Sequence, residues 1–331
     1  MMIVKNLFLF ILLNLLSFSM IAQDRGEGAW WPSIHGADDE AGATNYVTPT
    51  KIMEALSLPQ EGKVYELGHP YERIQPAYLD RPYRLNIVKR ASPTSVSLTE
   101  YFTGYIGQMG TQYDALGHQG RFVQNEDGES HYIFYNGFTD DDLIGDDLGA
   151  DGIQHLGVEG MKPIITKGLL IDIAGYKGVR TLSTNYVVTL SDVLETLEWQ
   201  GMSEDDIEIG DAILFNYGWS VHWGNPAKYN DGYVGRGENQ GSPGIYTEVA
   251  RWLLTKDISI VGADSCCVEV RPNPGTESVH HLLFLEQGIP ILENLDLIEL
   301  ANDRTYEFLL IALNERMVGA TGSMIRPIAI R

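Results

Sequence analysis

The sequence predicts an α/β fold built as one domain, because segments with strand and helix patterns alternate along its second half. Apolar runs of strand length cover residues 164–174, 212–217 and 258–264. Between them, residues 191–199 and 243–254 place apolar side chains at helical spacing. No internal repeat or low-complexity linker divides the chain, so about 300 residues after the N-terminal segment are expected to share one core.

Capping residues mark the expected helix starts. Thr48 and Ser242 are each followed by proline, a residue favoured in the first turn of a helix. Ser278 precedes a third, shorter helical segment, and residues 289–292 follow it as a strand. This return from helix to strand brings the two ends of the segment close together.

The first 22 residues have the pattern of a signal peptide. A positive charge at Lys5 precedes an apolar run that closes on the small residue Ala22. Polar residues interrupt the run, which therefore falls short of the roughly 20 apolar residues of a membrane anchor. We expect cleavage near Ala22, export to the periplasm or the medium, no membrane attachment of the product, and one domain over residues 23–331.

An excess of acidic residues sets the charge of the chain. It holds 23 basic and 45 acidic residues, which give a formal net charge of −22. Such a surface repels phosphate backbones, so the composition argues against nucleic acid as a partner. The simpler interpretation is that the charge keeps an exported protein soluble.

The two cysteines of the chain, Cys266 and Cys267, are adjacent. Their Cα atoms are ~3.8 Å apart, below the separation of about 4.4 to 6.8 Å that is usual for a disulfide. The sequence therefore predicts no structural disulfide framework. Two small buried residues after a strand are favoured, and a strained disulfide between neighbours or a redox role is the alternative.

Residues 108–118 gather side chains that can bind a metal ion. In an extended strand, Gln108, Gln112 and Asp114 share one face because alternate residues point the same way. Gly117 allows a turn that returns His118 towards them. On these residues alone, a turn held by hydrogen bonds competes with an ion site.

A second group of candidate ligands lies in residues 279–293. A helix over residues 279–287 is ~13 Å long at 1.5 Å per residue, and a returning strand of five residues covers ~16 Å. Glu293 is therefore expected level with His281, and an imidazole beside a carboxylate suits a zinc- or manganese-type ion. A buried hydrogen-bonded pair of His281 and Glu293 is the alternative.

Taken together, these motifs resemble the metal-dependent cyclase family, which includes bacterial kynurenine formamidase and isatin hydrolase. The likeness rests on GTQYDALGH at residues 110–118, on the histidine pair with Glu293 twelve residues after its second member, on PGI from Pro243, and on DDEAGATNYVTP in the N-terminal lead-in. It extends from about residue 31 to residue 297. The family signature is H-x-G-T-H-x-D-x-P-x-H, and the chain matches it at Gly110, Thr111, Asp114 and His118.

The resemblance implies a set of functional residues. Asp114, His281 and Glu293 stand at ligand positions of the family, with Gln112 as a possible fourth oxygen ligand. His118 is implied as the group that shuttles a proton beside the ion, with a role as a plain metal ligand as the alternative.

Three positions depart from the family signature. Gln108 and Gln112 stand where the family has histidines, and Leu116 replaces proline. A glutamine oxygen is neutral and suits Mn²⁺ better than Zn²⁺. A paired-metal site is therefore expected to be reduced to one ion or lost.

The resemblance also implies a fold and an activity. The fold is the swivelling β/β/α type, a mixed sheet layered with helices, in a homodimer or larger homo-oligomer. The activity is hydrolysis of a carbon–nitrogen bond in a small amide, formamide or cyclic amide, with Mn²⁺ or Zn²⁺ as cofactor. Two alternatives remain: a non-catalytic exported binding protein that retains the pocket, and a hydrolase of lactones or cyclic esters.

Overall fold

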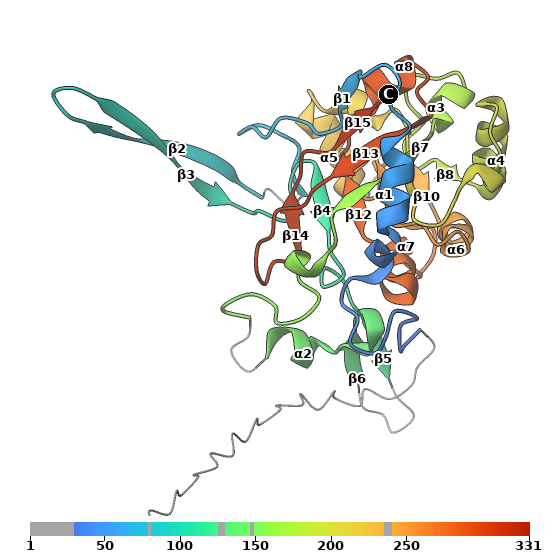
Figure 1. Ribbon diagram of the computed structural model, residues 1–331, viewed down its shortest axis with the longest axis horizontal. Helices are drawn as coiled ribbons and strands as arrows, with labels where there is room; N and C mark the ends of the chain where they lie inside the picture. The colour runs from blue at the N-terminus through green and yellow to red at the C-terminus, as the bar shows by residue number, and fades with distance from the viewer. Residues whose placement is uncertain (1–29, 79–80, 125–129, 146–148, 235–239) are drawn as a thin grey trace, which may run out of the picture.

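Strands from both halves of the chain form one mixed sheet (Figure 1). The computed structural model describes residues 30–78, 81–124, 130–145, 149–234 and 240–331. Within these ranges, nine strands of the sheet lie in the order β1-β15-β13-β7-β9-β11-β12-β4-β14. The predicted signal peptide, residues 1–22, lies outside the described residues, and export stays a prediction.

The centre of the sheet is parallel and its two sides are antiparallel. The central strands are β7 (Ile164–Ile171), β9 (Ala212–Phe215), β11 (Ile260–Ala263) and β12 (Ile291–Glu293). One side adds β13 (Glu307–Ala312), β15 (Ile328–Ile330) and β1 (Val64–Glu66), and the other adds β4 (Gln112–Asp114) and β14 (Gly322–Met324). Every residue of β9 and β11 is buried, as expected for parallel strands that are covered on both faces. The predicted α/β class with a mixed sheet is confirmed.

Helices accompany this sheet, and two of them, α1 (Pro49–Leu56) and α4 (Leu190–Trp199), contact its strands β7 and β13 most. The other longer ones are α5 (Pro226–Val234) and α6 (Thr247–Leu254). Shorter ones are α2 (Asp140–Ile144), α3 (Ile173–Tyr176), α7 (Val279–His281) and α8 (Ile298–Asn302), the 3₁₀ turns η1 (Gly42–Tyr46), η3 (Tyr135–Gly137), η4 (Val158–Gly160), η5 (Glu204–Asp206) and η6 (Trp219–His222), and the π-helical turn η7 (Leu282–Glu286). No helix in the described part of the chain has the length and apolar character needed to cross a bilayer.

One predicted helix start is confirmed and another is wrong. Thr48 accepts a hydrogen bond from the Lys51 N–H at the start of α1. Ser242 begins no helix, because it exchanges two backbone hydrogen bonds with Arg271 and the next residues form β10 (Gly244–Ile245), which pairs with β8 (Val187–Val188). The helix α6 therefore starts only at Thr247.

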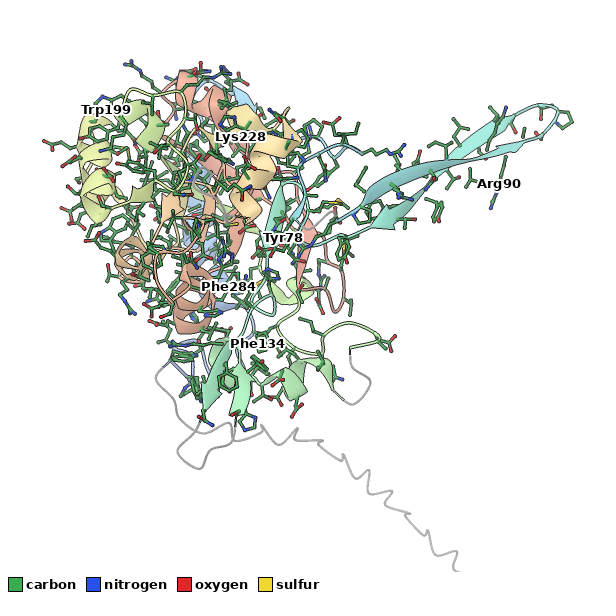
Figure 2. The ribbon with its side chains drawn as sticks, turned by 180° about the vertical axis from the view of Figure 1, so that it is seen from behind. Tyr78, Arg90, Phe134, Trp199, Lys228 and Phe284 are labelled. Carbon is green, nitrogen blue, oxygen red and sulfur yellow. The ribbon has the colours of Figure 1, made fainter. Side chains whose placement is uncertain are left out.

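A long hairpin projects from the body of the protein (Figure 1). Its strands are β2 (Tyr83–Ala91) and β3 (Val96–Gly104), and nearly all of their residues are exposed. Figure 2 shows Arg90 far out on this hairpin and Tyr78 near its base. A shorter hairpin consists of β5 (Arg121–Gln124) and β6 (Ser130–Ile133). Neither hairpin was predicted from the sequence.

His69 is expected to make folding stability depend on pH. Its buried ring stacks on Trp223 with centroids 4.0 Å apart, and burial lowers its pKa to about 4 although Asp296 opposes the shift. The unfolded chain binds the proton near pH 6.5. The contribution of neutral, buried His69 to the free energy of unfolding is therefore complete above pH 6.5 and is lost as the pH falls towards 4. The free energy of unfolding can be measured in urea at pH 7.5 and pH 4.5 for wild type and His69→Phe. Between these pH values it should fall by roughly 2–3 kcal/mol more in wild type than in the variant. An equal loss in both proteins would contradict this assignment.

Candidate metal centre

The pairing of β4 with β12 places three polar side chains on one face of the sheet. Glu293 lies directly opposite Gln112, and Asp114 is two residues further along β4. Because alternate residues of a strand share a face, all three point the same way. On the other side of β4, Gly322 pairs with Asp114, and a Cβ there would lie 2.9 Å from Gln108 Nε2. The glycine therefore leaves room for the Gln108 amide beside the site.

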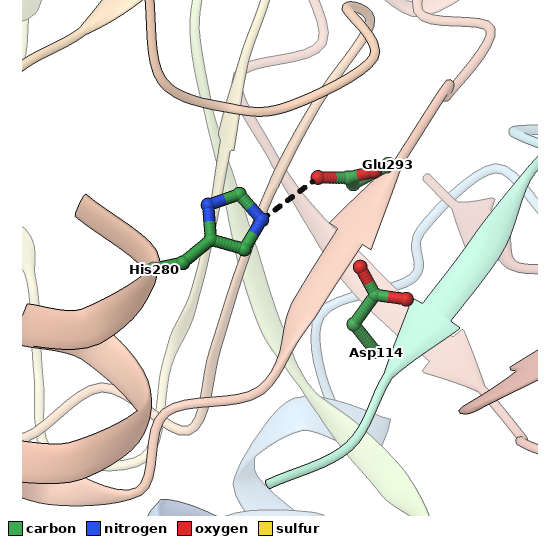
Figure 3. A group of neighbouring side chains, drawn as sticks. All are labelled: Asp114, His280 and Glu293. Carbon is green, nitrogen blue, oxygen red and sulfur yellow. Dashed lines mark hydrogen bonds and ion pairs between the residues drawn. The ribbon is translucent and has the colours of Figure 1, made fainter. Parts of the chain in front are cut away.

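A histidine completes a cluster of three potential metal ligands (Figure 3). Ligand atoms of Asp114, His280 and Glu293 all lie within 4.8 Å of one another, and all three residues are buried. His280 Nε2 is 3.2 Å from Glu293 Oε1. Within the described residues, these three side chains form the group of histidine, cysteine or acidic residues whose ligand atoms lie close enough together to hold one ion.

The structure brings His280 to Glu293 and not the predicted ligand, His281. The expectation assumed an unbroken α-helix from residue 279 to residue 287. Instead, α7 ends at His281 and continues as the π-helical turn η7, whose i→i+5 pattern places an extra residue in the turn. The residue that faces the strand therefore shifts by one position. His281 is half-buried and lies outside the cluster.

Glu269 orients the His280 ring from its other side. Its Oε1 lies 3.1 Å from His280 Nδ1, and its Oε2 accepts a hydrogen bond of 2.7 Å from the Val279 N–H. Burial raises the pKa of Glu269, but His280 and Arg271 outweigh it and bring the pKa to about 2. Ionised Glu269 can hold the Nδ1–H of His280, which leaves Nε2 free for an ion. Glu269 could not be predicted from the sequence, because it lies in a loop without a regular pattern.

Two side chains of the cluster have shifted pKa values, which make ion binding depend on pH. Burial and the neighbouring Asp114 raise the pKa of Glu293 to about 7. Burial lowers the pKa of His280, but Glu269 and Glu293 outweigh it and raise the pKa well above its usual value. Without an ion, His280 therefore keeps a proton at neutral pH. An ion must displace that proton, so its affinity should increase as the pH rises.

Two glutamine amides contact the carboxylates. Gln112 Nε2 lies 3.1 and 3.2 Å from the Asp114 oxygens and 2.9 Å from Glu293 Oε2. Gln108 Nε2 is 3.4 Å from Asp114 Oδ1. A rotation of the Gln112 amide by half a turn exchanges its nitrogen and oxygen. It would give a cation two carboxylates, one imidazole and one amide oxygen, a donor set that fits a divalent ion such as Mn²⁺.

His118 lies beside the cluster. Its Nε2 is 3.9 Å from Asp114 Oδ2, and its ring meets Phe284 edge to face. Burial lowers the pKa of His118, and the positive charges of His280 and Arg81 act in the same direction against Asp114. The imidazole is therefore neutral at neutral pH and can accept a proton.

A cavity of about 190 Å³ opens onto these side chains. It is smaller than the roughly 300–1,000 Å³ typical of sites for drug-sized ligands, so it suits a compact substrate. Arg81 is held in its wall by a hydrogen bond of 2.7 Å from Nη1 to the Gln108 carbonyl oxygen. The lining residues are Tyr78, Arg81, Gln108, Gln112, His118, Gln119, Cys266, Cys267, Arg271, His280 and Glu293.

Gln112→His should shift the metal preference from Mn²⁺ towards Zn²⁺. The substitution replaces an amide oxygen by an imidazole nitrogen, which is the softer donor. Competition titrations with the two ions should give a Zn²⁺-to-Mn²⁺ affinity ratio about tenfold or more above that of wild type. An unchanged ratio would place Gln112 outside the coordination of the ion.

Comparisons with known proteins identify the family and the fold. The model of the family described as "Putative cyclase" matches residues 65–270. The solved structure of a novel cyclase is 28% identical with a TM-score of 0.77, and the match covers 90% of this chain and 98% of that chain. Isatin hydrolase A from Ralstonia solanacearum is 16% identical with a TM-score of 0.60, covering 86% and 99%.

A second isatin hydrolase shares the fold. Isatin hydrolase A from Labrenzia aggregata, bound to benzyl benzoate, is 17% identical with a TM-score of 0.55, and the match covers 81% of this chain and 93% of that chain. No curated protein matched the chain. Because the identity to the isatin hydrolases is only 16% and 17%, the likeness to them concerns the fold alone.

Proposed function

Since the chain belongs to the cyclase family, we propose that it is a metal-dependent hydrolase that cleaves a carbon–nitrogen bond of an amide, formamide or cyclic amide. The observation that supports this most is the convergence of Asp114, His280 and Glu293 at one small cavity. Proteins of the same fold carry the name isatin hydrolase. The donor set, the cavity and the family together favour hydrolysis of a small substrate.

In such a reaction, some side chains of the site bind the ion and another accepts a proton. A bound divalent ion supplies polarisation of a carbonyl group and activation of water. Asp114, His280 and Glu293 would hold it, and the Gln112 oxygen would be a fourth donor once the amide, whose nitrogen now contacts Glu293, is rotated. His118, neutral at neutral pH, accepts a proton next to Asp114.

Two arginines in the cavity wall suit the charge that develops during hydrolysis. Arg81 and Arg271 both line the cavity. Attack on an amide carbonyl builds negative charge on its oxygen, and the carboxylate product also carries a negative charge. Fixed positive charges near that oxygen favour both species.

A substrate panel tests the proposed activity. Protein loaded with Mn²⁺ or Zn²⁺ should hydrolyse aryl formamides or cyclic amides, lose activity with a chelator and regain it when the ion is returned. Turnover of lactones alone would instead support a hydrolase of cyclic esters. A protein that binds the ion and turns over neither class would overturn the hydrolase and support a binding protein, in agreement with the two glutamines at histidine positions.

We also propose that the projecting hairpin joins two copies of the chain. One face of the hairpin is mostly apolar: Leu85 lies opposite Phe102, and Ile87 and Leu98 are more than half exposed, although Glu100 and Lys89 lie opposite these two on the same face. A two-stranded hairpin with an uncovered apolar face is marginally stable in water. Residues 83–104 carry three basic and one acidic residue, a net charge of +2, so the rest of the chain carries −24. This charge favours the acidic body of a second copy as the partner.

The mass of the protein in solution tests this assembly. Light scattering after gel filtration should give a dimer or larger oligomer for wild type and a monomer for Leu98→Lys. Thr99→Lys is the matched control, because it adds the same charge on the opposite face of the hairpin. A monomeric wild type, or equal dissociation of both variants, would contradict the proposal.

A further inference from the structure

Two adjacent thiols lie in the wall of the cavity. Cys266 and Cys267 follow β11, are both buried, and have their sulfur atoms 2.6 Å apart. Both are free cysteines. Both also line the same cavity as His118 and Glu293. A small solute that enters the cavity therefore meets a dithiol, and neither sulfur has a role in the proposed hydrolysis.

We propose that Cys266 and Cys267 form a site of reversible oxidation, at which a small peroxide converts the dithiol into a disulfide between neighbouring residues. Hydrogen peroxide first oxidises one thiol to a sulfenic acid and releases one water molecule. The second thiol then attacks the sulfenic sulfur, which forms the S–S bond and releases a second water. The two thiols lose two hydrogens and two electrons, and one peroxide becomes two waters.

Backbone geometry makes this disulfide easy to reduce. The Cα atoms of adjacent residues are ~3.8 Å apart, closer than the usual 4.4–6.8 Å. Closing the bond therefore strains the chain, and strained disulfides are the labile ones. A dithiol reductant should reopen the bond and return both thiols.

The loop that carries the thiols also carries the residue that orients His280. Glu269 lies two positions after Cys267 and holds His280 Nδ1. The Cys267 carbonyl oxygen accepts the Glu269 N–H, so the two residues share one tight turn. Closing the disulfide changes that turn and with it the orientation of the His280 ring. This consequence for ion binding rests on the proposed function, whereas the oxidation itself does not.

Arg271 lies next to the reactive pair. Its positive charge favours a thiolate at Cys267, but burial dominates and keeps the pKa of that thiol well above its usual value. Reaction with peroxide at neutral pH should therefore be slow. Incubation over hours with a small excess of peroxide is the suitable condition.

Counting thiols tests the oxidation. The chain has only two cysteines, so the full-length protein should change from two titratable thiols to none after peroxide and return to two after a dithiol reductant. Under denaturing, non-reducing conditions, the mass should remain that of one chain. Cys266→Ser and Cys267→Ser should each show no reductant-reversible disulfide within the chain. Two thiols that persist in wild type, or a disulfide that links two chains, would overturn the proposal.

Histidine NMR of the ion-free protein tests the link to His280. Oxidation should shift the ring nitrogen signals of His280 in wild type and leave them unshifted in Cys266→Ser, which controls for peroxide damage to the nine methionines. The Mn²⁺ dissociation constant of wild type should change by about tenfold or more, the size typical of disturbed partners of a ligand histidine. A disulfide that forms without moving the His280 signals would overturn the link. Failure of every form to bind an ion would instead count against the proposed function.

Discussion

Replacing His280 with alanine should weaken binding of a divalent ion by more than about 100-fold. The imidazole is one of three side chains that could hold an ion and that converge on the site, and disturbing an outer partner of a ligand histidine typically costs about 10–100-fold. Isothermal titration with Mn²⁺ and elemental analysis of the purified protein measure the loss. Because alanine leaves Glu269 and Glu293 buried without their shared partner, His280→Asn serves as a second variant that keeps a polar side chain.

The chain provides a matched control in the next residue. His281→Ala removes the same side chain from the same helix but lies outside the ligand group, so ion affinity should stay within about twofold of wild type. Glu269→Gln should fall between the two, with a loss of about 10–100-fold. Equal losses in His280→Ala and His281→Ala would contradict the assignment of His280. Thermal unfolding of each variant separates loss of the ligand from loss of the fold.

The centre of the fold could be predicted because buried parallel strands have a local signature. β9 and β11 are continuous apolar runs, and such runs arise where both faces of a strand are covered. The hairpin of β2 and β3 shows apolar alternation only on one face, at Leu85 and Ile87. In the sequence this alternation is mixed with basic residues, and because nearly all residues of the hairpin are exposed, no buried face distinguishes it from a loop.

Of the three residues in the candidate cluster, Asp114 and Glu293 could be predicted, whereas His280 stands one position before the predicted His281. Parity along β4 was enough to place Gln112 and Asp114 on one face, and the return of a helix into a strand was enough to bring Glu293 near a histidine. The choice between His280 and His281 depends on the π-helical turn η7. A single extra residue in a turn leaves no periodic signal in five residues of sequence. Glu269 was missed for a related reason, since its position depends on the tertiary path of a loop.

Replacing His118 with alanine should lower kcat by about 10² to 10⁴ while the ion stays bound. The ring is next to Asp114, with its Nε2 3.9 Å from Oδ2, and it lines the cavity without belonging to the group of three ligands. Burial lowers its pKa, so the neutral form is present at neutral pH and should remain available somewhat below pH 6.5. Positioned proton transfer contributes rate enhancements of this size, and the loss should fall on kcat more than on KM.

Activity and metal content must be measured on one preparation to separate the two possible roles of His118. Gln119→Ala is the control, because Gln119 is the next residue in the cavity wall and its loss perturbs the cavity without removing an imidazole. In wild type, kcat should decrease as the pH falls through the lowered pKa of His118, and His118→Ala should lack that decrease. If activity falls only in proportion to lost metal, His118 is a ligand and the proton-transfer role is wrong.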